Sequence, residues 1–299
     1  MGKQTTFSPL LALVLGVLGF TFAVLVLTVG SVRTQSSADF IRTPYFLAWL
    51  IMNGIQGGFW VVVIVPLVRW LGQLRNGWRK RQRDVVLGLV LLLAVVLIAD
   101  YFFAEFYHPK DLPLYNHMTR ITILNLAGSP LAVVAILGIW LVQGELEVEL
   151  SAPKLTFQHA EKLIMLRRQA MLFLTIAGFI IGTSTLSFGV MRNAVMLVEP
   201  ARKDFPPISV VVWGVFYSSI LALAYAPTYL AFADAESRIE HDIAPVPPDT
   251  EGDPAEWLKE KNSLQEHLST GGTGWAQFQS VFSIFAPLMG SVIPVLMGF

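Results

Sequence analysis

The chain is dominated by long uncharged stretches, each about as long as a helix that crosses a lipid bilayer. A bilayer core about 30 Å thick takes roughly 20 residues of α-helix. Only 14% of the 299 residues are charged and 54% are hydrophobic, whereas soluble globular proteins carry about 25% charged residues. We predict an all-α integral membrane protein, a bundle of about seven transmembrane helices at residues 9–32, 44–68, 85–106, 121–143, 170–193, 207–233 and 275–298.

The third and seventh spans are less regular than the other five. In the third, Val85 to Ala99 are free of charge, but Asp100 and Glu105 follow within the stretch LIADYFFAEFYH. This span reaches membrane length only if its aromatic cluster lies at the bilayer interface, where Trp and Tyr are enriched. The seventh contains two glutamines and two prolines. A re-entrant or surface-lying segment is the alternative to the kinked crossing that we favour.

The loop between the second and third spans is rich in Lys and Arg. Its basic cluster comprises Arg75, Arg79, Lys80, Arg81 and Arg83. Short basic loops stay in the cytoplasm, so we predict a cytoplasmic N terminus and a location in the cell membrane, plasma or inner. This threading puts 14 of the 21 Lys and Arg residues inside and 7 outside. A second interpretation is that the cluster binds anionic lipid headgroups, each basic residue contributing about 1 kcal/mol.

The sequence divides into a helical core at residues 1–233, an acidic cytoplasmic loop at 234–274 and a last membrane segment at 275–299. The loop has a net charge of −7 and a Pro-rich centre, which is typical of an extended linker. Asp253 and Pro254 then signal the start of a short amphipathic helix ending near Leu268. We expect this helix to dock on the protein near the basic cluster.

Two further features are predicted on the cytoplasmic side, between the fourth and fifth spans. The stretch GELEVELSAPKLTF at residues 144–157 alternates polar and apolar residues around a Ser-Ala-Pro break, which suggests a small β-hairpin. The following HAEKLIMLRRQ is predicted to extend the fifth span as a helix beyond the membrane.

Polar side chains gather in the outer half of five predicted spans. Such groups are costly in a membrane, so their depth is the best functional clue in the sequence. Asn53 and Gln56 share a helix face, as do Thr122, Asn125 and Ser129. We predict an outward-facing polar vestibule lined by Asn53, Gln56, Asp100, Glu105, Asn125, Ser129, Thr183, Ser187 and Tyr217. Its two acids would raise the local concentration of cations.

The alternative is that these polar groups only join helices to one another. Asn, Ser and Thr hydrogen-bond between membrane helices, and glycines four residues apart, such as Gly54 with Gly58 and Gly178 with Gly182, let helices approach closely. Asp100 and Glu105 would then simply sit in interfacial water. The sequence leaves both interpretations open.

Several classes of chemistry lack support. The chain has no cysteine, and therefore no thiolate chemistry or Cys-bound metal. All five histidines lie outside the spans, which argues against a haem held by two histidines. No zinc-protease, hydrolase or nucleotide-binding motif occurs. The acids and histidines between Glu105 and His117 are irregularly spaced and interrupted by Pro109. We predict no catalytic residue, no metal site, no cofactor and no nucleic acid partner.

The function that fits these features best is passage of an ion or small solute, as a channel or transporter. The alternative is a non-catalytic membrane scaffold or sensor that engages a cytoplasmic protein partner through its acidic loop. Beyond the lipid bilayer itself, the small-residue helix faces suggest a homo-oligomer.

Overall fold

The computed structural model describes residues 8–107, 112–199, 205–243, 245, 257–259, 261–264 and 274–297. Within these ranges the regular secondary structure is all helical. The helices are α1 (Pro9–Thr28), α2 (Gln35–Ile41), α3 (Pro44–Gln73), α4 (Arg75–Tyr107), α5 (His117–Glu149), α6 (Phe157–Val198), α7 (Pro207–Ile243) and α9 (Gly274–Met297).

Proline and threonine set where several of these helices begin. Pro9 and Pro44 lie in the first turns of α1 and α3, where a missing N–H costs nothing. The Thr43 side chain accepts a hydrogen bond from the Phe46 N–H at 3.0 Å, and Thr156 forms a capping box with His159 at the start of α6. These side chains satisfy backbone donors that a helix start leaves unpaired.

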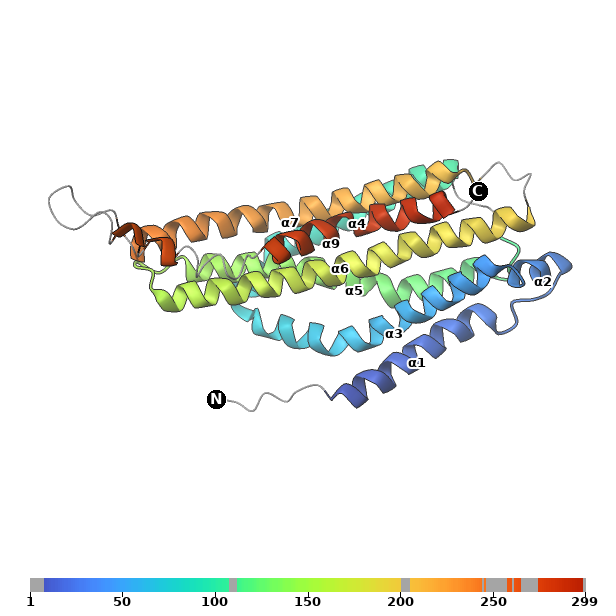
Figure 1. The fold of residues 1–299 in the computed structure, drawn as a ribbon, viewed down its shortest axis with the longest axis horizontal. Helices are drawn as coiled ribbons and strands as arrows, with labels where there is room; N and C mark the ends of the chain where they lie inside the picture. Colours follow the sequence, from blue (N-terminus) through green and yellow to red (C-terminus); the bar gives the residue numbers. More distant parts are fainter. Residues whose placement is uncertain are drawn as a thin grey trace.

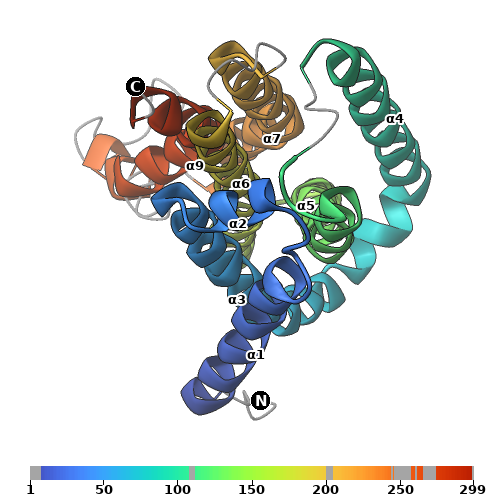
Figure 2. The same ribbon diagram turned by 90° about the vertical axis from the view of Figure 1, so that its right-hand side faces the viewer.

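The helices run along one long axis, and α6 lies at the centre of the bundle (Figures 1 and 2). It packs against α3, α5, α7 and α9, whereas α1 packs mainly on α3 and α4 mainly on α5. We call the end that carries α2 and residues 112–117 the cap end. The opposite end, where α4 begins and α5 and α7 finish, is the loop end.

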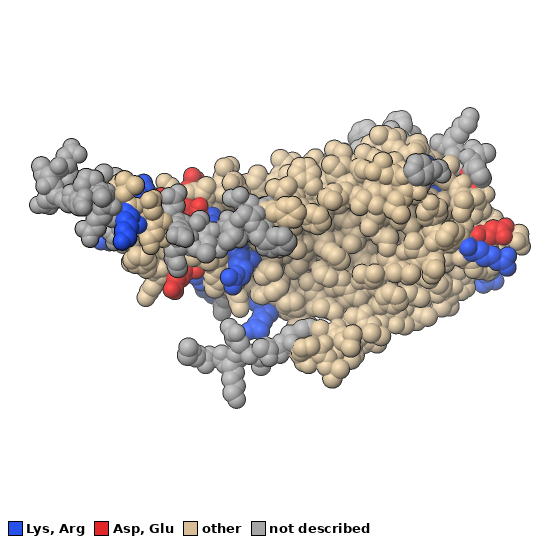
Figure 3. Space-filling view, viewed as in Figure 1, with Lys and Arg blue, Asp and Glu red and all other residues tan. Residues whose placement is uncertain are grey.

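Six helices are long and apolar enough to cross a membrane among the described residues: α1, α3, α5, α6, α7 and α9. The chain is therefore a multi-pass membrane protein by length and composition. Figure 3 shows a broad uncharged band with charged side chains at both ends. The predicted third span lies within α4, but the side chains of Asp100 and Glu105 lie outside the described residues. Its crossing stays a prediction.

The predicted hairpin at residues 144–157 is wrong, because α5 continues to Glu149. The alternating glutamates lie on a helix, and their partners are on the neighbouring helices α4 and α6. Glu145 accepts the Gly77 N–H at 2.9 Å, Glu147 pairs with Arg81, and the Glu149 carboxylate lies 3.8 Å from the Lys162 amine. The predicted helical extension of the fifth span is confirmed, since α6 begins at Phe157.

The last helix, α9, is continuous through both prolines. It lies against α6, where Gly178 and Gly182 face the backbone of Ser283 and Ala286. Side chains of α6 also bind α9 carbonyls: Thr185 Oγ1 donates to the Pro287 oxygen at 2.9 Å. The close approach and these bonds hold the segment as a full-length helix in the bundle.

At the loop end, part of the predicted amphipathic helix is described, at residues 257–259 and 261–264. Leu264 is buried, and the Trp257 indole N–H donates to the Pro245 carbonyl at 3.0 Å. Figure 1 shows the segment beside the end of α7. In the basic cluster, Arg79 and Arg83 are exposed, while the side chains of Arg75 and Lys80 lie outside the described residues. Docking between the two stays a prediction.

Candidate functional site

A cavity of about 380 Å³ lies between α3, α5, α6 and α7 in the half of the bundle nearer the cap end. Five of the predicted vestibule residues line it: Asn53, Gln56, Asn125, Ser187 and Tyr217. They come from four different helices, so the fold brings together side chains separated by up to 164 positions in the sequence. The cavity has the size of a small-molecule site, for which about 300–1,000 Å³ is usual.

The other four predicted residues are placed differently. Ser129 is exposed one turn beyond the cavity, and its hydroxyl donates to the Asn125 carbonyl at 2.5 Å. The Thr183 hydroxyl donates to the Phe179 carbonyl at 2.7 Å within α6 and does not line the cavity. Asp100 and Glu105 lie on α4 with side chains outside the described residues.

Two buried amides form the polar wall of the cavity on α3. Asn53 donates to the Trp49 carbonyl at 2.8 Å and to Ser187 Oγ at 2.9 Å. Gln56 donates to the Ile180 carbonyl at 3.2 Å and to Ser184 Oγ at 2.5 Å. Because each amide nitrogen points at a backbone carbonyl, which accepts only, the orientation of both amides is fixed.

The amide oxygens are therefore left over, and so is the Trp60 indole N–H, which is buried in the same wall without a hydrogen-bond partner among the described residues. Neither Asn53 Oδ1 nor Gln56 Oε1 accepts a hydrogen bond from any residue in the described part of the chain, and both side chains line the cavity. A buried polar group without a partner, as at Trp60 Nε1, costs about 1–3 kcal/mol. The wall thus offers two acceptors and one donor to something that enters.

Four aromatic side chains that sequence reasoning did not assign to the site also line the cavity: Trp49, Trp60, Phe188 and Trp213. Trp213 stacks on Tyr217 with ring centroids 5.5 Å apart, and the Trp60 ring fits against Gly128 of α5, where a Cβ would overlap it. The lining residues absent from the prediction are Trp49, Trp60, Leu112, His117, Met118, Ile121, Thr122, Leu124, Ser184, Thr185, Phe188, Met191 and Trp213. No signal in one sequence separates a Trp that lines a cavity from one that packs.

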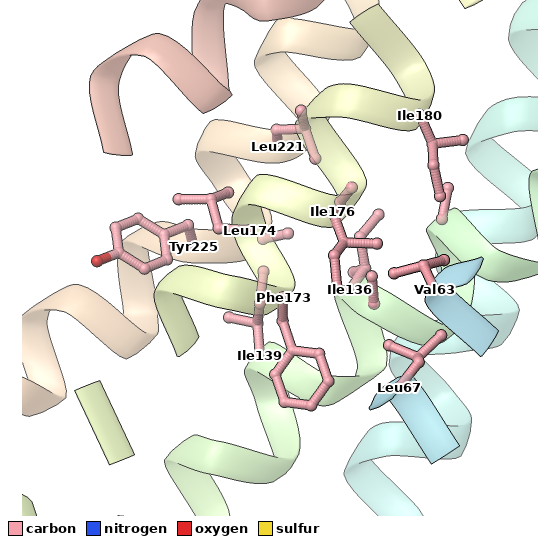
Figure 4. Close-up of a cluster of buried hydrophobic side chains, with 14 of the residues drawn as sticks. Val63, Leu67, Ile136, Ile139, Phe173, Leu174, Ile176, Ile180, Leu221 and Tyr225 are labelled. Carbon is pink, nitrogen blue, oxygen red and sulfur yellow. The ribbon is translucent and has the colours of Figure 1, made fainter. Parts of the chain in front are cut away.

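A packed apolar layer closes the cavity toward the loop end. Figure 4 shows this cluster, with side chains from α3, α5, α6 and α7 meeting at the centre of the bundle. Val63, Ile136 and Phe173 are at most 5% exposed, and Phe59 of α3 meets Phe179 of α6 with ring centroids 4.3 Å apart. Apolar packing therefore borders the cavity on its loop-end side.

The described lining contains no Asp, Glu, Lys or Arg. The described residues also hold no group of three or more acids and histidines able to bind a metal ion. Hydrogen bonding and aromatic contact are therefore the chemistry that this cavity offers. Comparisons of the chain with protein-family models, with curated proteins and with solved structures find no match.

Proposed function

We propose that this multi-pass membrane protein moves a small, uncharged, hydrogen-bond-donating solute across the cell membrane, with the cap-end cavity as its binding site. The observation that carries the proposal is the polar wall of the cavity: the amides of Asn53 and Gln56, whose oxygens accept no hydrogen bond from a described residue, and the unpartnered indole N–H of Trp60. A hydroxyl-bearing solute supplies the missing donors, and the tryptophans and tyrosine supply flat faces against its carbon skeleton.

The orientation of the cavity in the membrane is inferred from the charge distribution. Most Lys and Arg residues belong to the loop end, which the positive-inside rule assigns to the cytoplasm. The cavity would then lie in the outer half of the membrane, as the vestibule hypothesis requires. Since the apolar layer closes its inner side, passage requires that α3, α5 and α6 shift relative to one another, as in a carrier with alternating access.

The test is solute uptake by liposomes that contain the purified chain, with glycerol as the probe and light scattering as the measurement. We expect wild type to pass glycerol faster than empty liposomes. Gln56→Leu, which removes one free acceptor, should weaken apparent affinity roughly 3- to 10-fold. Asn125→Leu should act in the same direction, because Asn125 also lines the cavity.

Ser129→Ala is the matched control, since Ser129 lies on the same face of α5 but outside the cavity. Its uptake should equal that of wild type. If wild-type liposomes pass no solute under any gradient, transport is excluded and the scaffold or sensor alternative takes its place. Equal uptake by all variants would show that solute does not cross through this cavity.

A further inference from the structure

The cavity is covered on the side where a water-borne solute would enter along the bundle axis. Helix α2 and residues 112–117 lie across the cap end (Figure 2). They are tied together: Ser37 Oγ donates to the Pro113 carbonyl at 2.6 Å, and the Tyr115 N–H donates to the Ser31 carbonyl at 3.1 Å. Phe40 of α2 and Leu114 of the 112–117 segment are themselves almost fully buried. The axial route is therefore the closed one.

The exposed side of the cavity lies on α5. All four lining residues of α3 are buried, whereas Met118, Thr122 and Asn125 of α5 are exposed, Met118 by 59%. Ser184 of α6 is the other exposed lining residue, and its hydroxyl is already bonded to Gln56. The opening is thus on the flank of the bundle.

The position of α7 defines this flank. Trp140 Nε1 of α5 donates to the Ala224 carbonyl of α7 at 3.1 Å. The Trp140 ring also lies against Gly88 of α4. Thr122 precedes Trp140 by about five helical turns and so lies on the same face of α5, which is turned toward both α7 and α4. The bond from Trp140 and the one from the Thr228 hydroxyl to the Ile139 carbonyl, at 3.5 Å, join α5 and α7 on the loop-end side of the cavity, while Tyr217 of α7 lines it. The mouth is between α5 and α7.

Exposed apolar side chains flank this mouth, and α4 lies on the same side of α5 (Figure 2). Leu126 of α5 is 70% exposed and Leu223 of α7 is 74% exposed. The side chains of Thr122 and Asn125, in contrast, form no hydrogen bond with any described residue. Polar groups without partners are costly at a lipid-facing surface. Their presence at the mouth indicates that a polar group passes or rests there.

We propose that the ligand is a single-chain amphiphile with an uncharged, hydroxyl-bearing head, which enters from the bilayer between α5 and α7. Its head donates to Asn53 Oδ1 and Gln56 Oε1, and its chain leaves past Thr122 and Asn125 into the lipid. The inference rests on the proposed function, because it names the class of solute that uses the same cavity. A volume of about 380 Å³ holds such a head and the start of one chain.

The test is photolabelling of the full chain in lipid nanodiscs. The probe is a monoacylglycerol with a diazirine on the acyl chain next to the ester, and labelled residues are located by mass spectrometry. We expect label on the mouth residues of α5 and on Tyr217 of α7. Excess unlabelled monoacylglycerol should remove that label, whereas glycerol at the same concentration should not, because it lacks the chain.

Two matched variants make the test specific. Thr122→Trp fills the mouth and should reduce mouth labelling to the background level of α1, whereas Ser129→Trp, exposed on the same helix outside the cavity, should leave it unchanged. Gln56→Leu should require roughly 3- to 10-fold more probe for half-maximal label.

Three results would overturn the inference: label spread evenly over all lipid-facing helices, equal labelling in both tryptophan variants, or equal protection by glycerol. Cross-linking of Thr122→Cys to a second copy would do so too, since an oligomer would then cover the polar flank. If Gln56-dependent glycerol uptake occurs without mouth labelling, the proposed transport stands and the lateral entry fails. If the mouth is labelled specifically but no glycerol uptake occurs, the proposed ligand class stands and the proposed transport is wrong.

Discussion

Single residues decide how closely the first helix approaches the bundle. A Cβ on Gly19 of α1 would overlap the carbonyl of Gly57 on α3, and such small-residue contacts are what lets membrane helices pack at short range. The spacing of the glycines in α3 predicted that another helix packs closely there. It did not indicate which helix that is.

We expect Gly19→Ala to push α1 away from α3 and to reduce stability by about 1–3 kcal/mol, the usual effect of overpacking. Gly72→Ala is the control, because nothing lies within 4 Å of its Cβ position, and alanine favours a helix over glycine by about 0.5–1 kcal/mol. Thermal unfolding in one detergent measures both. Equal shifts in the same direction would contradict the close contact.

The helical spacing of polar residues predicted the site correctly only where all residues on one helix face point toward the cavity. Asn53 and Gln56 both reach the cavity because they are one turn apart on a buried face of α3. Ser129 was grouped with Asn125 by the same logic, yet the cavity ends before it. Thr183 is one residue from Ser184, and that 100° rotation keeps it off the cavity wall.

At the scale of helices, α4 is anchored near its beginning. Gly77, in its first turn, lies against α5, and its N–H donates to the buried Glu145 carboxylate at 2.9 Å. A carboxylate at a helix N terminus also interacts favourably with the helix dipole. Further along, Gly88 meets the Trp140 ring, whereas successive side chains such as Val86, Leu87, Val90 and Leu91 are about half exposed.

Glu145→Ala is therefore expected to loosen the start of α4 and to cost about 1–3 kcal/mol, since it leaves a buried N–H without its acceptor. Hydrogen exchange at Gly77 and the following turn should increase. The comparison is Glu149→Ala, whose 3.8 Å pair with Lys162 is partly exposed and contributes at most about 1 kcal/mol. Similar exchange in both variants would argue that Glu145 does not hold α4.

The hairpin error also belongs to this scale. An alternation of glutamate with apolar residues fits a strand facing solvent on one side, and equally a helix whose carboxylates have partners in several directions. The partners of Glu145 and Glu147 come from α4, far away in sequence, and the partner of Glu149 lies on the following helix, α6. Periodicity within one segment contains no information about them.

At the scale of the whole molecule, bilayer length and charge bias determine most of what one sequence can predict. Uncharged runs located the six long apolar helices, because lipid rejects charge within a span. The order in which the helices surround α6 was not predictable. It depends on contacts such as those of Gly178 and Gly182 with α9, which the same small residues would make equally well with another helix.

Orientation is the remaining whole-molecule prediction, and the absence of native cysteine makes it testable with single substitutions. Tyr115→Cys places a thiol at the exposed cap end. Tyr115 is preferable to Asn116, whose φ of 53° disfavours a cysteine. Asn76→Cys places a thiol within the basic loop. With that loop in the cytoplasm, an impermeant maleimide added to intact cells should label only Tyr115→Cys, and Asn76→Cys should react after permeabilisation.

The unsubstituted chain provides the blank for this experiment, because it has no thiol to react. Labelling of Asn76→Cys in intact cells would show that the protein has the opposite orientation in the membrane. The cavity would then open in the cytoplasmic half of the membrane, and a solute or amphiphile bound by Asn53 and Gln56 would come from the inner leaflet side. The orientation result therefore decides from which leaflet the mouth between α5 and α7 is reached, independently of what enters it.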